Sequence, residues 1–245
     1  MSTAVFMLII FVTSALQRLS GFSFALLSVV GATALSVASL WQITFAVTLL
    51  LVANAAYGII SIGRWPDSAS LLSLLAGVLP GTLAGLGLLG LLAGTSDVIT
   101  DWLLGGFTLT SAVMLARGGV FVASLTRPYM MLLGVVSGLS GGALGAPGPA
   151  LVYGLYSQPL KIDEVRLLLF SVFLVYGGFR TIAVVSSGGL DPESISLAVA
   201  GLPAAILGTH CGQRLAGRLA GDQVRPLAVV LLVISGAIVL TRPFY

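Results

Sequence analysis

Apolar stretches of about 20 residues recur along this 245-residue chain and constrain its fold more than any other feature. As helices they are long enough to cross the ~30 Å hydrocarbon core of a bilayer, whereas barrel strands would alternate polar and apolar residues over ~10 positions. Only 8% of the residues are charged and 58% are hydrophobic, while soluble domains carry about 25% charged residues. We predict an all-α, polytopic integral membrane protein with one transmembrane domain over 1–245.

Six of the apolar segments are continuous, and two further apolar regions are interrupted. The continuous segments lie at 39–61, 67–94, 98–116, 163–187, 192–216 and 225–241. The interrupted regions, 4–37 and 129–158, contain clusters of glycine, serine and proline at 17–23 and 137–149. Proline removes a backbone donor, and glycine costs about 1 kcal/mol in a helix relative to alanine. Each interrupted region is therefore predicted to form a hairpin of two helices that meet at unwound backbone.

The same order of segments occurs twice, as an interrupted hairpin followed by three continuous segments. A shift of about 123 residues aligns three pairs of identical residues: Pro80 with Pro203, Gly85 with Gly208, and Gly94 with Gly217. We therefore predict about eight helical segments in two repeats, the first over about 1–120 and the second over about 125–245.

The distribution of charge predicts the orientation, because cytoplasmic loops carry an excess of arginine and lysine. The loops at 62–66, 117–127 and 212–225 contain arginines, whereas 95–101 and 188–193 contain acidic residues and no basic one. Both chain ends are then external. Each repeat crosses the membrane an odd number of times, so the two repeats are inverted relative to each other. Transporters with inverted repeats bind substrate where broken helices meet near the midplane.

Residue types that enzymes and metal sites need are scarce in this sequence. All eight acidic residues fall in predicted loops or at segment ends, which leaves no carboxylate for a cation site inside the membrane. The single histidine and single cysteine cannot form a usual four-ligand zinc site. We expect no enzyme activity, no cofactor and no metal. No basic run suggests nucleic-acid binding, so the expected partners are lipid and a small ligand.

The two interruptions are the candidate substrate site. Unwound backbone at membrane depth must face protein or a wet cavity, because lipid cannot satisfy its polar groups. Free N–H groups at the helix starts after Gly21 and Pro149 would bind an anion, assisted by the positive ends of the helix dipoles. The predicted substrate ligands are Ser20, Gly21 and Ser23 in the first interruption, and Ser140, Gly141, Gly145 and Gly148 in the second. The alternative is that the glycines only allow close helix packing.

Two arginines, Arg18 and Arg180, lie in apolar regions without an acidic partner in their own segment. An arginine at the bilayer centre costs ~2.5–3.5 kcal/mol on insertion scales, so it should be paired or face water. The guanidinium stays charged and binds oxyanions through two N–H groups. Both arginines are therefore predicted substrate ligands. In the alternatives, Arg180 reaches the headgroups or caps carbonyls, and Arg18 lies at the interface.

Three further residues are predicted from the repeat and from helical spacing. Asn54 and Tyr57 align with Gly177 and Arg180, so a small anion between the equivalent helices would meet an amide and a phenol opposite a guanidinium. We include Asn54 and Tyr57 among the substrate ligands. His210, four residues before an arginine on one helical face, is a candidate gate or proton carrier, with hydrogen-bonded packing as the alternative.

The second interruption resembles the signature of the TauE/SafE family, also known as the sulfite exporter family. The similar residues are Ser137-Gly138-Leu139-Ser140-Gly141-Gly142, Gly145, Pro147, Gly148 and Pro149, which follow the family pattern SGLxGGxxGxGGP. Further similarities are Gly21-Phe22-Ser23-Phe24 to its GFGF, Gly201-Leu202-Pro203 with Gly208 to its GxPxxxxG, and Arg180 to the arginine of its Asn-x-x-Arg. Ser23 replaces a glycine of GFGF, and Gly177 stands where the family often has asparagine.

The resemblance implies a multi-pass transporter of the bacterial inner membrane that moves sulfite, sulfonates or related organic anions, and it is compatible with a homodimer. An anion-selective channel that uses the same residues is an alternative, as is a membrane subunit that only binds partners.

Overall fold

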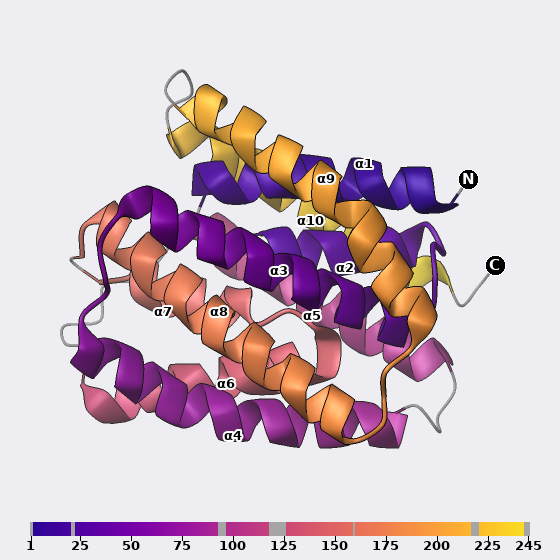
Figure 1. The fold of residues 1–245 in the computed structure, drawn as a ribbon, viewed down its shortest axis with the longest axis horizontal. Helices are drawn as coiled ribbons and strands as arrows, with labels where there is room; N and C mark the ends of the chain where they lie inside the picture. Colours follow the sequence, from indigo (N-terminus) through magenta and orange to yellow (C-terminus); the bar gives the residue numbers. More distant parts are fainter. Residues whose placement is uncertain are drawn as a thin grey trace.

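The computed structural model describes residues 2–20, 23–92, 97–117, 126–158, 160–216 and 221–242. Every regular element in these ranges is a helix, which confirms the all-helical prediction (Figure 1). The helices are α1 (Ser2–Ser20), α2 (Phe24–Ala34), α3 (Leu40–Ile62), α4 (Ser68–Leu92), α5 (Asp97–Arg117), α6 (Arg127–Leu144), α7 (Gly148–Tyr156), α8 (Ile162–Ser186), α9 (Pro192–Ala216) and α10 (Gly221–Thr241).

Five helices in the described residues are long and apolar enough to cross a membrane: α3, α4, α5, α8 and α9. Shorter apolar helices lie within α1, α2 and α10. Large apolar side chains cover the outside of the bundle, with Ile60 77%, Leu91 76% and Ile182 69% exposed. A soluble monomer rarely exposes large contiguous apolar surface, so lipid is the solvent of this surface. The chain is a multi-pass membrane protein.

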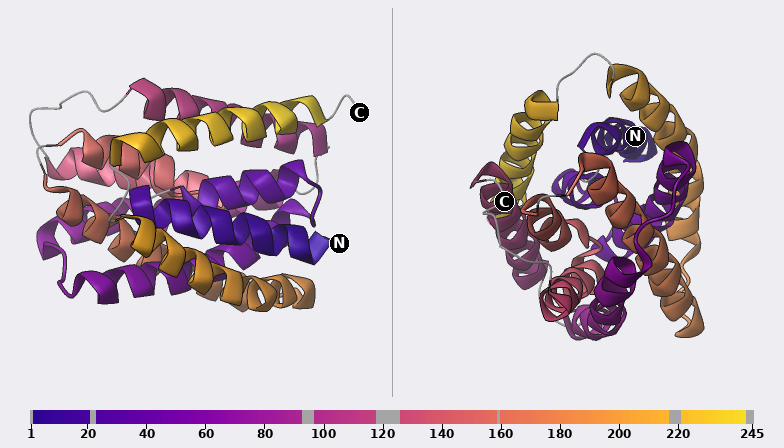
Figure 2. Two further views of the ribbon diagram at one scale, coloured as in Figure 1. Left: turned by 90° about the horizontal axis from the view of Figure 1, so that it is seen from above. Right: turned by 90° about the vertical axis from the view of Figure 1, so that its left-hand side faces the viewer.

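Most helices run roughly along one direction and associate in a few close pairs. α4 packs along α6, α5 along α10 and α3 along α8, while α9 passes obliquely over α1 (Figure 1). The short helix α2 is enclosed by the longer ones, as the end-on view of Figure 2 shows, and nine of its eleven residues are buried. α1 begins and α10 ends at the same end of the bundle (Figure 2), and that this end is external stays a prediction.

The helices around both interruptions extend further than predicted. α1 continues through Arg18, and α6 continues through Gly138 to Leu144. The reason in α6 is its packing: a Cβ atom on Gly138 would overlap backbone atoms of α4. Small residues let membrane helices approach closely, and this contact offsets the low helix propensity of glycine. The prediction that the glycine cluster unwinds the backbone from residue 137 onward was wrong.

The second interruption is consequently confined to residues 145–147. Gly145 ends α6 with φ 67°, and its N–H donates to the Gly141 carbonyl oxygen at 2.8 Å, as in a glycine C-cap. α7 begins at Gly148, before Pro149 rather than after it. Proline is tolerated there because a first-turn N–H has no partner within the helix.

The predicted loop 95–101 is also shorter, because α5 begins at Asp97. Asp101 therefore lies inside the helix, where it is buried and forms an ion pair with Arg242 at 3.5 Å. This pair ties α5 to the end of α10.

Candidate anion-binding site

Arg180 is fully buried in α8, with 0% of its surface exposed. Its Nη1 donates to Thr44 O at 3.1 Å and to Thr48 Oγ1 at 2.7 Å, and its Nη2 donates to Thr44 Oγ1 at 3.2 Å. Its Nε has no hydrogen-bond partner in the described part of the chain. The guanidinium therefore does not extend to the headgroups. It does bind one backbone carbonyl, as the capping alternative expected.

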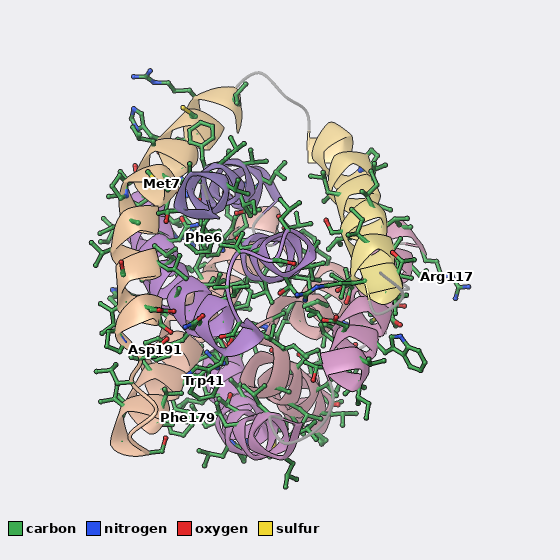
Figure 3. All side chains as sticks on the ribbon, turned by 90° about the vertical axis from the view of Figure 1, so that its right-hand side faces the viewer. Phe6, Met7, Trp41, Arg117, Phe179 and Asp191 are labelled. Atoms are coloured by element: carbon green, nitrogen blue, oxygen red, sulfur yellow. The ribbon has the colours of Figure 1, made fainter. Side chains whose placement is uncertain are left out.

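No carboxylate pairs with this guanidinium among the residues that the structure describes, whose ion pairs are Arg166–Asp163 and Arg242–Asp101. Removing a charge from water costs several kcal/mol per ion even after the protein relaxes. Three neutral acceptors leave the positive charge itself uncompensated. An oxyanion at this position would supply the missing charge. Unlike the buried side chain of Arg180, the side chain of Arg117 at the end of α5 points away from the bundle (Figure 3).

Thr44 and Thr48 of α3 form the cradle for Arg180. They are one turn apart on the same face of the helix. Thr44 Oγ1 donates to Trp41 O at 3.0 Å, and Thr48 Oγ1 donates to Thr44 O at 2.6 Å. Each hydroxyl hydrogen is thus used within α3, which leaves the oxygen lone pairs to accept from Arg180. The sequence analysis missed both threonines, although their i,i+4 spacing in an apolar segment was a usable signal.

The start of α3 is held against the turn between α8 and α9. Gln42 Nε2 donates to Glu193 Oε2 at 2.6 Å, and a Cβ on Gly189 would lie 2.9 Å from the Trp41 ring. Trp41 and Asp191 lie on the same side of the bundle in Figure 3. These contacts hold α3, which supplies the cradle, against the end of α8, which supplies Arg180.

The second interruption lies against this cradle. A Cβ on Gly145 would come within 2.9 Å of Thr44 Cβ, so only glycine fits at this left-handed position. Tyr176, one turn before Arg180, is buried, and its hydroxyl donates to Gly141 O at 2.7 Å. Gly141 packs directly on the Tyr176 ring. α6, its glycine cap and α8 therefore meet at Arg180, and sequence analysis did not single out Tyr176.

Ser140 and Gly148, the other predicted ligands here, have different surroundings. Ser140 Oγ lies 3.1 Å from both Ser137 O and Ala146 O, to which it donates. The hydroxyl hydrogen of Ser140 is therefore used in hydrogen bonds that stabilise the second interruption itself. A Cβ on Gly148 would make only ordinary contact, 3.7 Å from Phe173, so the start of α7 is not tightly enclosed there.

The first interruption is described only in part. Arg18 lies in the last turn of α1 and is half-buried. The side chain of Ser20, and the whole of Gly21, lie outside the described residues. Ser23 is buried and precedes α2 with φ 86°, a left-handed conformation that glycine adopts far more readily. Serine thus occupies a glycine conformation at the position where the resemblance expects glycine.

Asn54 belongs to a separate polar cluster. Its Nδ2 donates to Gln17 Oε1 of α1 at 2.5 Å, and its Oδ1 accepts from Thr209 Oγ1 of α9 at 2.9 Å. Asn54 lies six residues after Thr48 on α3, a rise of ~9 Å. Tyr57 is 41% exposed and donates to Gln213 Oε1 at 3.1 Å. The structure therefore does not bring Asn54, Tyr57 and Arg180 around one small anion, because Asn54 and Tyr57 bind side chains of α9 at a different height along α3 from the partners of Arg180.

His210 of α9 is exposed, so the structure does not support hydrogen-bonded packing, and its role as a gate or proton carrier stays a prediction. In the described residues no group of three or more histidine, cysteine, aspartate or glutamate side chains could hold a metal ion.

Comparisons with known proteins agree with the membrane fold. The family model described as Sulfite exporter TauE/SafE matches residues 6–239, which extend from α1 into α10. A protein of Cupriavidus necator named "Probable sulfite/organosulfonate exporter TauE" is 26% identical over 222 residues, covering 90% of this chain and 87% of that protein. No solved structure matches the chain. This chain belongs to the TauE/SafE sulfite exporter family, whose members are transporters and not enzymes.

Proposed function

We propose that this protein exports a small sulfur-containing oxyanion, sulfite or an organosulfonate, across a bacterial inner membrane. The anion binds Arg180 at a site between the two helical hairpins. The observation that carries this proposal is the buried guanidinium of Arg180, which no described carboxylate neutralises. Arginines inside a membrane pair with acidic groups or with backbone carbonyls, and in the described residues Arg180 donates to one carbonyl only.

The geometry of Arg180 fits an oxyanion with two oxygens to share. A guanidinium has five N–H groups, and three of them donate to Thr44 and Thr48. Two remain, and the one on Nε is unpartnered. A sulfite or sulfonate group can accept both in the side-by-side manner that arginine forms with oxyanions. The free N–H groups at the start of α7, beside the glycine cap, would add neutral donors.

We propose further that the fold consists of two inverted repeats, each a hairpin and three helices. In the aligned sequence α1 corresponds to α6, and α4 to α9. The close pairs α4–α6 and α1–α9 are then equivalent, while α3–α8 and α5–α10 each pair a helix with its own counterpart. Pro80 and Pro203 lie inside the corresponding helices α4 and α9. This reciprocal pairing supports a two-fold relation of the kind found in transporters with inverted repeats.

Export follows from the negative charge of the ligand and the negative potential of the cell interior. A negative interior favours exit of an anion by ~2.3 kcal/mol per charge for each 100 mV. Proton coupling would require His210 or the substrate itself to carry the proton.

The test is sulfite flux into proteoliposomes together with thermal stabilisation of the purified protein by sulfite, since a ligand that binds the folded state raises apparent stability. Arg180→Gln should lose both. Arg117→Gln, which removes an exposed arginine from the end of α5, should retain both. Arg180→Gln protein that folds, is stabilised by sulfite and transports it like the parent would refute the assignment.

Counterflow separates a transporter from the alternative, an anion-selective channel. Labelled sulfite should accumulate transiently against its gradient when unlabelled sulfite leaves the vesicle. A channel that uses the same residues would give flux without counterflow.

A further inference from the structure

A second group of buried polar side chains lies on α1, away from Arg180. Ser14 is 0% exposed and Gln17 is 1% exposed. Their spacing of three residues puts them on one face of α1. Neither Ser14 Oγ nor Gln17 Nε2 has a hydrogen-bond partner among the described residues. Buried polar groups in native proteins are nearly always hydrogen-bonded, so two such orphans on one helical face require an explanation.

The surroundings of Gln17 indicate what is missing. Gln17 Oε1 already accepts from Asn54 Nδ2, and Asn54 Oδ1 accepts from Thr209 Oγ1. Thr209 Oγ1 also lies 2.8 Å from Ala205 O, so its single hydrogen is shared between two acceptors. In this arrangement the part of the Gln17 side chain without a hydrogen-bond partner is its NH₂ group, which is a donor. The missing partner is therefore an acceptor, such as an oxygen of an anion.

The position of this cluster separates it from the Arg180 cradle. Gln17 lies in the last turns of α1 and Thr209 in the second half of α9, both toward the end of the bundle opposite to the start of α1. Arg180 binds near the start of α3, at the other end. Because the two clusters lie ~9 Å apart along α3, one sulfite ion cannot contact both.

We propose that Ser14, Gln17, Asn54 and Thr209 form a second, uncharged oxyanion subsite on the cytoplasmic side, which the anion occupies before it reaches Arg180. This inference rests on the proposed function. The four side chains are neutral, so they offer the anion hydrogen bonds without the charge and the paired N–H groups with which a guanidinium binds an oxyanion. A weaker subsite beside a stronger one suits conduction, since each position must bind well enough to fill and weakly enough to release.

The experiment compares transport with binding in the same variants, with sulfite as the probe. Gln17→Glu keeps the size and the acceptor oxygen of the side chain but removes both N–H donors and adds negative charge. We expect sulfite flux to fall about tenfold or more, which corresponds to about 1.4 kcal/mol. The sulfite concentration for half-maximal thermal stabilisation should stay within about twofold of the parent value, since Arg180 is intact.

Ser14→Ala provides a second variant in case Gln17→Glu does not fold. It removes one orphan hydroxyl and should lower flux in the same direction with unchanged stabilisation. Thr33→Val is the matched control. Thr33 is also buried with an unpartnered hydroxyl, but it lies in the last turn of α2, away from this cluster, and flux should persist.

The outcomes separate the two proposals. If sulfite neither stabilises the parent protein nor is transported by it, the proposed function itself is wrong. If the parent transports sulfite and both Gln17→Glu and Ser14→Ala retain full flux, the proposal of a second subsite is wrong. The assignment of Arg180 as the anion-binding residue is then unaffected. Parallel loss of flux and stabilisation in these variants also overturns it, because that pattern indicates a structural role.

Discussion

The bond between Thr48 and Arg180 allows a quantitative test of how the buried charge is held. Thr48→Val preserves the shape of the side chain and removes the hydroxyl that accepts from Arg180 Nη1 at 2.7 Å. Thr108→Val is a close control in α5. Both threonines are 0% exposed, and both hydroxyls donate to the carbonyl four residues earlier at 2.6 Å. The two substitutions differ mainly in the bond to the guanidinium.

A hydrogen bond to a charged group contributes about 1.5–3 kcal/mol. We expect Thr48→Val to lower the free energy of unfolding by that amount more than Thr108→Val does, equivalent to roughly 10- to 100-fold in the unfolding equilibrium constant. The measurement is ligand-free unfolding of the purified protein in detergent, followed by helical circular dichroism. Equal losses of stability in the two variants, within about 0.5 kcal/mol, would refute the reasoning that Arg180 depends on the α3 hydroxyls.

Three further predictions concern packing and backbone conformation. Gly138→Ala should destabilise the protein by at least about 1–3 kcal/mol, because its Cβ meets backbone of α4, whereas Gly87→Ala, with open space around its Cβ, should be neutral or stabilising in the same unfolding assay. Ser23→Gly should raise the melting temperature, since φ 86° is strained for serine by about 1–2 kcal/mol; a lower melting temperature would contradict this. Tyr176→Phe should cost only about 0.5–1.5 kcal/mol, because Gly141 O still accepts from the backbone N–H of the glycine cap; a larger loss would indicate that the hydroxyl has another role.

The backbone conformation of the glycine cluster in the second hairpin could not be predicted from local helix propensity alone. Glycine density predicts unwound backbone, yet Gly138, Gly141 and Gly142 are all helical. The deciding contact is with α4, about 50 residues earlier in the chain, and nothing in the local sequence shows which face that helix presents. Only Gly145, with positive φ, uses the conformational freedom that the pattern suggested.

The candidate site shows a similar division. Arg180 could be singled out from the sequence because a charge in a long apolar segment demands a partner or water. Its actual partners, Thr44 and Thr48, lie more than 130 residues earlier and depend on how α3 packs along α8. The repeat alignment placed Asn54 opposite Arg180. In the structure the two belong to separate clusters. The position of a residue along a helix determines both its height in the bundle and the helix face on which its side chain lies.

By itself, the sequence determined that this protein is a bundle of apolar helices in lipid, interrupted at two places, with an arginine that has no acidic partner in its own segment. Those properties follow from composition and from the order of residues along one helix. The tertiary structure decided which hydroxyls hold Arg180, where the interruptions begin, and that Gln17 and Asn54 share a second cluster. Each of these depends on contacts between helices distant in sequence, which local propensity does not encode.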